Sequence, residues 1–166
     1  MSGFGWDMPD TSAMAVSRTR ALAILTSRTT PDDVVRFHDA EGNFAGPTFQ
    51  DLDPAHDNEV VASDLLAVTL MNVAVQPAAV RRILEDPGNQ HRLTESLRTV
   101  PANVSLAEAD QDVLNSAARL YQLFKELLRG NKWVTASKLA ARKRPALIPV
   151  RDRVIVKHLE LDNRDF

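Results

Sequence analysis

The chain has no cysteine among its 166 residues, which excludes disulfide bonds and thiolate metal sites. Aromatic residues make up only 5% of it, with two tryptophans and one tyrosine. No apolar run approaches the ~18 residues that cross a membrane, so we expect no membrane contact. The N-terminal stretch carries acids where a signal peptide has Lys or Arg, and we expect a cytoplasmic protein. The four histidines show no paired ligand spacing, so we expect no metal and no cofactor.

The composition that remains is that of an ordinary globular protein. Apolar residues make up 44% of the chain and charged residues 25%. This length and composition allow one sizeable core. We expect residues 1–15 to be a flexible leader and residues 16–166 to form a single compact α-helical domain.

Helical periodicity dominates the pattern, so the expected class is mainly α, with about six to eight helices. Residues 29–57 are rich in Pro, Gly, Asp and Asn, and we expect a loop there. The best strand signal, 146–150, contains Pro149, which argues against a central strand. We expect helices over residues 17–28, 58–75, 77–86, 89–99, 105–129, 135–140 and 154–161.

Two of these helices carry the expected core. The 58–75 segment has a wide apolar arc typical of a central helix, and Asp57 or Asn58 can cap it. Asp64 lies within that segment, where it is either exposed or buried with a partner. In the 105–129 segment, Ser105 can act as the N-cap and Glu108 has the spacing of a capping box. Its predicted core face consists of Val113, Ala117, Leu120, Phe124 and Leu127 or Leu128.

Charge is strongly segregated along the chain. Residues 1–128 hold ten Lys/Arg against eighteen Asp/Glu, whereas residues 129–158 hold nine against one. A basic segment of this kind suits contact with a phosphate polymer. The alternative is internal, with the basic segment packed against the acidic body of the protein.

The basic segment is arranged around a glycine turn. One helix is separated from the next by the turn Gly130, Asn131, Lys132, Trp133 and Val134, after which free amide groups at the start of the second helix can bind phosphate. A plain helical hairpin is the structural alternative. We expect further nucleic-acid contacts from Lys138, Arg142, Arg144 and Arg151.

Asp152 is the one acid in this segment, and it allows two roles. It can cap the final helix. It can also be an ionised carboxylate beside Arg151 and Arg153 that stabilises an oxocarbenium-like transition state at a sugar carbon.

Two resemblances follow from these residues. The chain resembles an actinobacterial family of unknown function in two segments: Trp133–Val154, which reads WVTASKLAARKRPALIPVRDRV, and Asp64–Val68. This resemblance implies no particular activity. More remotely, Leu128, Gly130 and Ala136 resemble the hairpin of the helix–hairpin–helix DNA glycosylases, and Asp152 follows Pro149-Val150 much as their catalytic aspartate follows its Pro-Val pair.

The second resemblance implies a helix–hairpin–helix-like C-terminal unit that binds DNA phosphate through 130–134, with Asp152 as the catalytic residue. Lys132 replaces the second hairpin glycine of that family. Val134 stands where the bifunctional enzymes have a lysine, so any activity would be that of a monofunctional glycosylase-like hydrolase.

Two functional hypotheses therefore stand. One is a small helical nucleic-acid-binding protein that contacts DNA through residues 129–158, with catalysis left open. The other is a non-catalytic protein–protein interaction module whose basic segment docks on an acidic protein surface.

Overall fold

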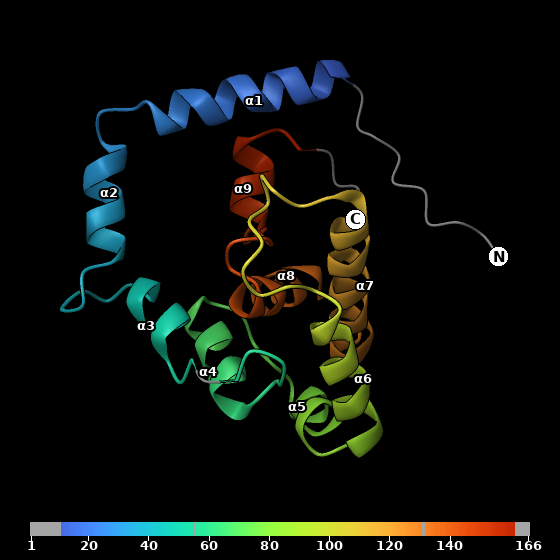
Figure 1. The fold of residues 1–166 in the computed structure, drawn as a ribbon. Coiled ribbons are helices and arrows are strands. Elements are labelled where there is room, and N and C mark those ends of the chain that lie inside the picture. The colour runs from blue at the N-terminus through green and yellow to red at the C-terminus, as the bar shows by residue number, and fades with distance from the viewer. Residues whose placement is uncertain (1–10, 55, 131, 162–166) are drawn as a thin grey trace. The chain divides into compact units, whose positions relative to one another are not determined.

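The computed structural model describes residues 11–54, 56–130 and 132–161, and all regular structure within these ranges is helical (Figure 1). The mainly α class is therefore confirmed, and 146–150 is not a strand. The described residues form nine helices: α1 (Thr11–Leu25), α2 (Thr30–Phe37), α3 (Gly46–Asp51), α4 (Ala62–Leu70), α5 (Pro77–Leu84), α6 (Pro87–Arg98), α7 (Gln111–Leu128), α8 (Trp133–Lys143) and α9 (Arg153–His158).

Helix α7 begins later than the sequence suggests. Its N-cap is Asp110, whose Oδ1 accepts a hydrogen bond from the Val113 amide at 2.9 Å. The expected contact between Ser105 and Glu108 does form, with Oγ and Oε2 2.6 Å apart, but it closes a turn ahead of the helix. The prediction that Ser105 is the N-cap was wrong. Asp110 lies closer to the continuous apolar face of α7, and its side chain accepts from the free amide at the start of that helix.

Helix α4 is shorter than the expected 58–75 segment. It starts after Val61, whose amide donates to Asp64 Oδ2 at 3.0 Å, so neither Asp57 nor Asn58 caps it. Asn72 adopts a positive φ of 59° just beyond its end, a conformation that an α-helix cannot continue through.

The expected loop over residues 29–57 contains two helices, α2 and α3. Phe49 of α3 is buried and belongs to the core, whereas Phe44, ahead of α3, is exposed. Gly46 lies against Phe37, where an added Cβ would come within 2.3 Å of the Phe37 carbonyl oxygen. The contact between these two residues therefore requires glycine at position 46.

The described residues divide into two units. The first comprises residues up to Val34 and from Asp152 onward, and so contains α1 and α9. Within it, Ser17 donates to the Leu159 carbonyl at 2.6 Å, and Arg20 pairs with Glu160 at 2.5 Å. Residues 1–10 of the expected leader lie outside the described residues, and α1 begins at Thr11. The single domain expected over 16–166 stays a prediction.

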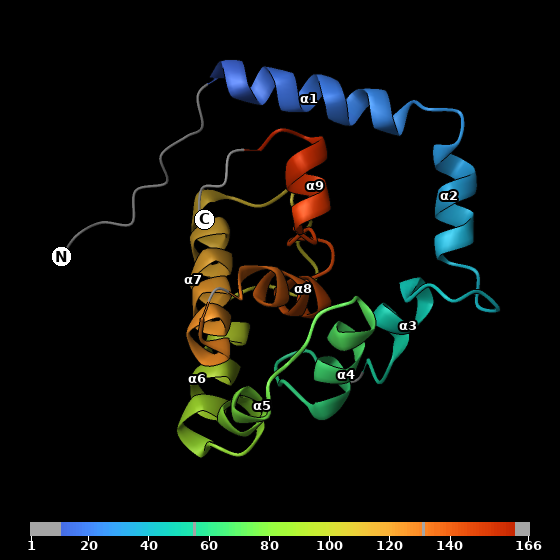
Figure 2. The ribbon, with the colours of Figure 1, turned by 180° about the vertical axis from the view of Figure 1, so that it is seen from behind.

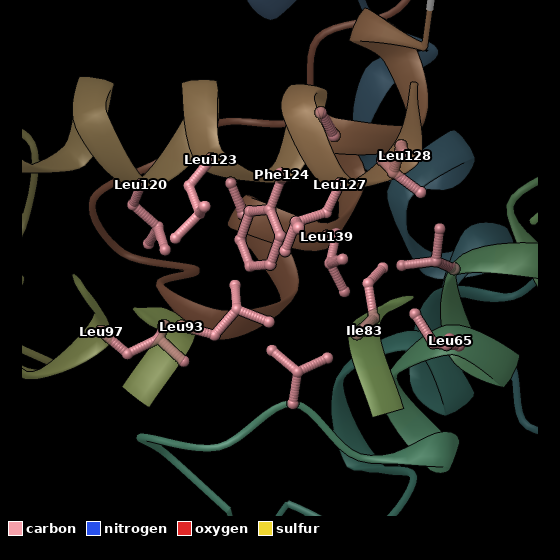
Figure 3. Packing of buried hydrophobic residues seen from close by; sticks show 14 of the residues in the cluster. Leu65, Ile83, Leu93, Leu97, Leu120, Leu123, Phe124, Leu127, Leu128 and Leu139 are labelled. Atoms are coloured by element: carbon pink, nitrogen blue, oxygen red, sulfur yellow. The ribbon is translucent and has the colours of Figure 1, made fainter. Parts of the chain in front are cut away.

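The second unit, Val35–Arg151, contains the hydrophobic core. Helices α7 and α8 pack side by side there, and α6 lies along α7 (Figures 1 and 2). Figure 3 shows Phe124 of α7 among Leu93 of α6, Ile83 of α5 and Leu139 of α8. The expected core face of α7 is confirmed at Ala117, Leu120, Phe124, Leu127 and Leu128, which are buried. Val113, the first expected member, is only partly buried and packs against the core.

Candidate nucleic-acid interface

The turn between α7 and α8 has an unusual backbone. Arg129, the C-cap of α7, has φ 55° and ψ 158°, and Gly130 has φ 67°. Positive φ at Gly130 fits its expected role as a helix stop. Arg129 occupies a region that is otherwise nearly restricted to glycine, so its conformation is strained. Asn131, the next residue of the predicted turn, lies outside the described residues.

Aromatic and cationic side chains alternate beside this turn. Lys125 Nζ lies 5.6 Å from the centre of the Tyr121 ring, one helical turn away on α7. The Tyr121 hydroxyl donates to the Trp133 carbonyl at 3.4 Å, and Arg151 Cζ lies 5.3 Å from the Trp133 ring centre. We call the following set the turn cluster: Tyr121, Lys125, Arg129, Lys132, Trp133 and Arg151.

The backbone of Arg151 is hydrogen-bonded to α8. Its backbone amide donates to Ser137 Oγ at 2.7 Å, and Ser137 is buried. This hydrogen bond fixes the end of the segment that follows α8, and the Arg151 side chain can then lie over Trp133. Ser137 thus positions a residue of the turn cluster without being part of its surface.

Three cations of the turn cluster are not paired with acids of the described residues. Lys125, Arg129 and Lys132 form no ion pair with any acid of the described residues. The acid next to Lys125 in sequence is Glu126, and it is engaged elsewhere. It makes two hydrogen bonds with Arg92, at 2.8 and 3.0 Å, and the hydrogen bond from Arg92 holds the pKa of the Glu126 carboxyl below its usual value.

The N-terminus of α8 adds to this positive field. Its N-cap is Lys132, whose side chain has no acceptor atom, and its first turn contains no acid. The helix dipole places partial positive charge at the same end, so Lys132 is electrostatically unfavourable there unless an anion is nearby.

The cations farther along α8 have a different environment, because they are buried. Lys138 is 5% exposed, Arg142 7% and Arg144 1%, and Lys143 is buried with them. We call these four residues the buried cation group. The expectation that Lys138, Arg142 and Arg144 present their charge to a polymer is not met in this arrangement, because their donor atoms are directed into the protein. They match the alternative interpretation, in which the basic segment packs inside the protein.

Asp64 of α4 is the buried carboxylate that faces this group. Its Oδ1 accepts from Arg142 Nε at 3.2 Å and its Oδ2 from Lys143 Nζ at 3.0 Å. The Asp64 side chain is only 2% exposed. One carboxylate thus serves two buried cations, and it also holds the start of α4 through the Val61 amide.

Backbone carbonyl oxygens satisfy most of the remaining donors. Arg142 donates to Phe49 and Leu52, and Lys143 donates to His56 at 2.6 Å. Lys138 Nζ donates to the Met71 carbonyl at 2.7 Å, just past the end of α4. These bonds attach Phe49, Leu52, His56 and the end of α4 to α8. They leave no unsatisfied buried side-chain donor among the described residues.

Arg144 is the most completely enclosed member of the group. Its guanidinium donates to the carbonyls of Leu97 and Val100 at 2.6 and 2.7 Å, and to Asp57 at 2.8 Å. Burial lowers the pKa of Arg144 from its usual value, while the charge of Asp57 acts in the opposite direction. The side chain stays protonated because arginine does not lose its proton in proteins. It therefore fastens the end of α6 and residues 57–58 to the end of α8.

Asp152 occupies the capping position that the sequence allows. Its Oδ1 accepts from the Val154 and Ile155 amides at 2.9 and 3.0 Å, at the start of α9. The cap accounts for an acid at this position without any reaction. Its catalytic role stays a prediction.

The structure brings together some of the predicted site residues and separates others. Trp133 and Arg151 are in contact, and Gly130 and Lys132 precede Trp133 at accessible positions, whereas Lys138, Arg142 and Arg144 belong to the interior. Sequence reasoning missed Tyr121 and Lys125, whose i, i+4 spacing on an amphipathic helix was a usable signal. It also left Asp64 open, because the partners of that residue lie almost eighty positions away.

Two expected absences concern metal and membrane. No group of three or more His, Asp or Glu side chains in the described ranges could hold a metal ion. No helix in the described part of the chain is long and apolar enough to cross a membrane. We take the turn cluster as the candidate site because it combines cations with aromatic rings.

Comparison with curated proteins and with solved structures finds no match to this chain. A family model does match, and it spans α2 to the end of the chain, including α8 and the turn cluster. The match carries no activity, and the likeness to DNA glycosylases and the actinobacterial origin stay predictions. Residues 30–166 match this model, described as a family of unknown function (DUF6308), and the chain belongs to that family.

Proposed function

We propose that the protein binds nucleic acid through the turn cluster. The observation that carries the proposal is a series of three contacts: Lys125 beside the Tyr121 ring, the Tyr121 hydroxyl on the Trp133 carbonyl, and Arg151 over the Trp133 ring. Cations beside aromatic rings are the combination with which proteins bind both the phosphates and the bases of a nucleic-acid chain. We still expect the protein to act in the cytoplasm.

Local electrostatics favour this surface over the paired arginines of α6. Lys125, Arg129 and Lys132 lie within eight positions of one another, with no acid paired to them among the described residues. Elsewhere on the unit, Arg92 is paired with Glu126 and Arg98 with Glu95. An anionic polymer therefore gains more at the turn than at those neutralised positions.

The proposal differs from the hypothesis drawn from sequence in which residues touch the ligand. The buried cation group contributes to the fold, and the contacts come from the turn cluster. Fewer phosphates are therefore neutralised than the sequence suggests, and a moderate salt dependence follows. Each neutralised phosphate makes the slope of log affinity against log salt steeper by about 0.7 to 0.9.

The test is a binding titration at two salt concentrations with Lys132→Glu and a matched control. Arg98→Glu makes the same charge change on α6, outside the turn cluster, where it removes only an exposed pair with Glu95. We expect Lys132→Glu to weaken DNA binding and to flatten the salt slope, and Arg98→Glu to leave both nearly unchanged. Equal affinities for the two variants and the unmodified protein would refute the proposal.

The second hypothesis, docking on an acidic protein surface, uses the same cations. Polyglutamate of matched charge separates the two partners, because it has carboxylates but no bases. If polyglutamate competes as well as DNA does, the surface recognises negative charge alone and the interaction module is the better description.

A further inference from the structure

The face of α8 limits what kind of nucleic acid the turn cluster can take. A protein that reads duplex DNA in the major groove does so with an exposed helix or a two-stranded ribbon. In α8, every residue from Thr135 to Lys143 is buried. Only Trp133 and Val134, at its first turn, are partly accessible. The second helix of this hairpin is therefore a core helix and cannot enter a groove.

The accessible part of the hairpin presents flat groups. The Arg151 guanidinium lies over the Trp133 indole at 5.3 Å, and both side chains are half-buried. A guanidinium plane and an indole ring are both surfaces on which a nucleic-acid base can stack. Since every base has a π-face, such stacking requires no particular sequence.

We infer that the turn cluster takes single-stranded nucleic acid, with unpaired bases stacked on the Trp133–Arg151 layer and the phosphates near Lys125, Arg129 and Lys132. This inference rests on the proposed function and adds the class of ligand to it. A duplex keeps its base faces against one another, so it can offer this surface only phosphates. A single strand offers phosphates and bases together.

The expected preference follows from the value of one stacked base. Stacking on an aromatic side chain changes affinity by roughly fivefold to hundredfold per base. We therefore expect a single strand to bind at least about fivefold more tightly than the same sequence in a duplex.

The variant that tests stacking is Arg151→Lys. It keeps the positive charge but removes the guanidinium plane, and lysine does not replace arginine at a stacked site. The anchoring bond from the residue 151 amide to Ser137 belongs to the backbone and is retained. Lys132→Glu is the charge variant, and it changes the phosphate contacts for both kinds of ligand.

The experiment measures binding of an oligothymidylate of about twelve nucleotides, its duplex with oligodeoxyadenylate, and an abasic oligomer of equal length. The protein carries Trp6→Phe, so that Trp133 is the sole tryptophan and its fluorescence reports stacking. We expect the single strand to quench Trp133 and to bind most tightly. Arg151→Lys should remove most of its advantage over the duplex, with an unchanged circular dichroism spectrum.

Each other outcome has a defined meaning. If duplex, abasic oligomer and single strand bind equally, and Lys132→Glu weakens all three, the stacking inference is wrong while nucleic-acid binding stands. If Arg151→Lys keeps the full single-strand preference and the quenching, the Trp133–Arg151 layer is not the stacking surface and the inference is also wrong. If no oligomer binds more tightly to the unmodified protein than to Lys132→Glu, the proposed function and the inference both fail.

Discussion

Asp64 of α4 and Arg142 of α8 form an ion pair inside the second unit, with Oδ1 and Nε 3.2 Å apart and side chains 2% and 3% exposed. Lys143 shares the same carboxylate through its other oxygen. Removing charges from water is costly, and that cost is offset only when the partners and their remaining donors are all satisfied. The carbonyl acceptors around Arg142 and Lys143 meet this condition.

Asp64→Asn should therefore destabilise the protein strongly. The amide is nearly isosteric and can still accept from the Val61 amide, but it leaves two buried cations without a counter-charge. We expect a loss of about 3–5 kcal/mol in the free energy of unfolding, measured by urea denaturation. Glu95→Gln is the control, since it breaks an exposed pair worth about 0–1 kcal/mol. Similar losses in both variants would contradict the role given to Asp64.

Arg144→Lys tests whether the shape of the guanidinium, and not its charge alone, fastens α6 to the end of α8. Lysine retains the charge but cannot reach the carbonyls of Leu97, Val100 and Asp57 together. Each buried acceptor left unsatisfied costs about 1–3 kcal/mol. We expect a thermal unfolding midpoint several degrees lower, about 2–4 °C per kcal/mol. An unchanged midpoint would show that charge alone is enough.

Lys132→Glu should raise stability while it lowers DNA affinity. An acid at the start of α8 interacts favourably with the helix dipole, by about 0.3–1 kcal/mol at low ionic strength. The two effects have opposite sign, so weaker binding cannot be attributed to unfolding. Calorimetry in low salt and in high salt checks the stability change, which should shrink as salt increases. A destabilised variant would mean that Lys132 makes a favourable contact in the free protein.

Two substitutions at Asp152 separate its cap from any chemistry. Asn caps helices about as well as Asp, so Asp152→Asn should leave α9 intact, whereas Asp152→Ala should cost about 0.5–2 kcal/mol. Amide hydrogen exchange at Val154 and Ile155 reports the cap directly. If the carboxylate supports base release, Asp152→Asn loses that activity and keeps the exchange pattern. Activity that survives in Asp152→Asn would leave only the cap.

The sequence predicted the helical class and the core of α7 because these follow from local periodicity. Leu120 and Phe124 are spaced four apart on one face, and no distant partner is needed to place them. It failed at Lys138, Arg142 and Arg144 because a basic run has the same local pattern whether it is solvated or internal. These cations are buried because they bind backbone carbonyls of residues 49–57, Met71, Leu97 and Val100. Every residue has a backbone carbonyl, so no sequence pattern indicates which carbonyls will accept these hydrogen bonds.

The candidate site was predicted in part for the same reason. Gly130 marks the turn through its tolerance of positive φ, and Lys132 and Trp133 follow it directly. Arg151 is almost twenty positions from Trp133, and the two meet because the intervening segment is held to α8 by Ser137 and to the core by Leu147. Asp64 was left open between exposure and burial with a partner, because its partners on α8 lie almost eighty positions away.

The buried cation group has a consequence for how the second unit is completed during synthesis. The carbonyls of Phe49, His56 and Met71 are made early, and the side chains that bind them come from residues 138–143, some seventy to ninety positions later. A nascent chain that has reached only the end of α7 holds many of the acceptors and none of these donors. We expect translation products that stop there to be incompletely folded and readily degraded. Synthesis of α8 is therefore the step that allows the second unit to fold.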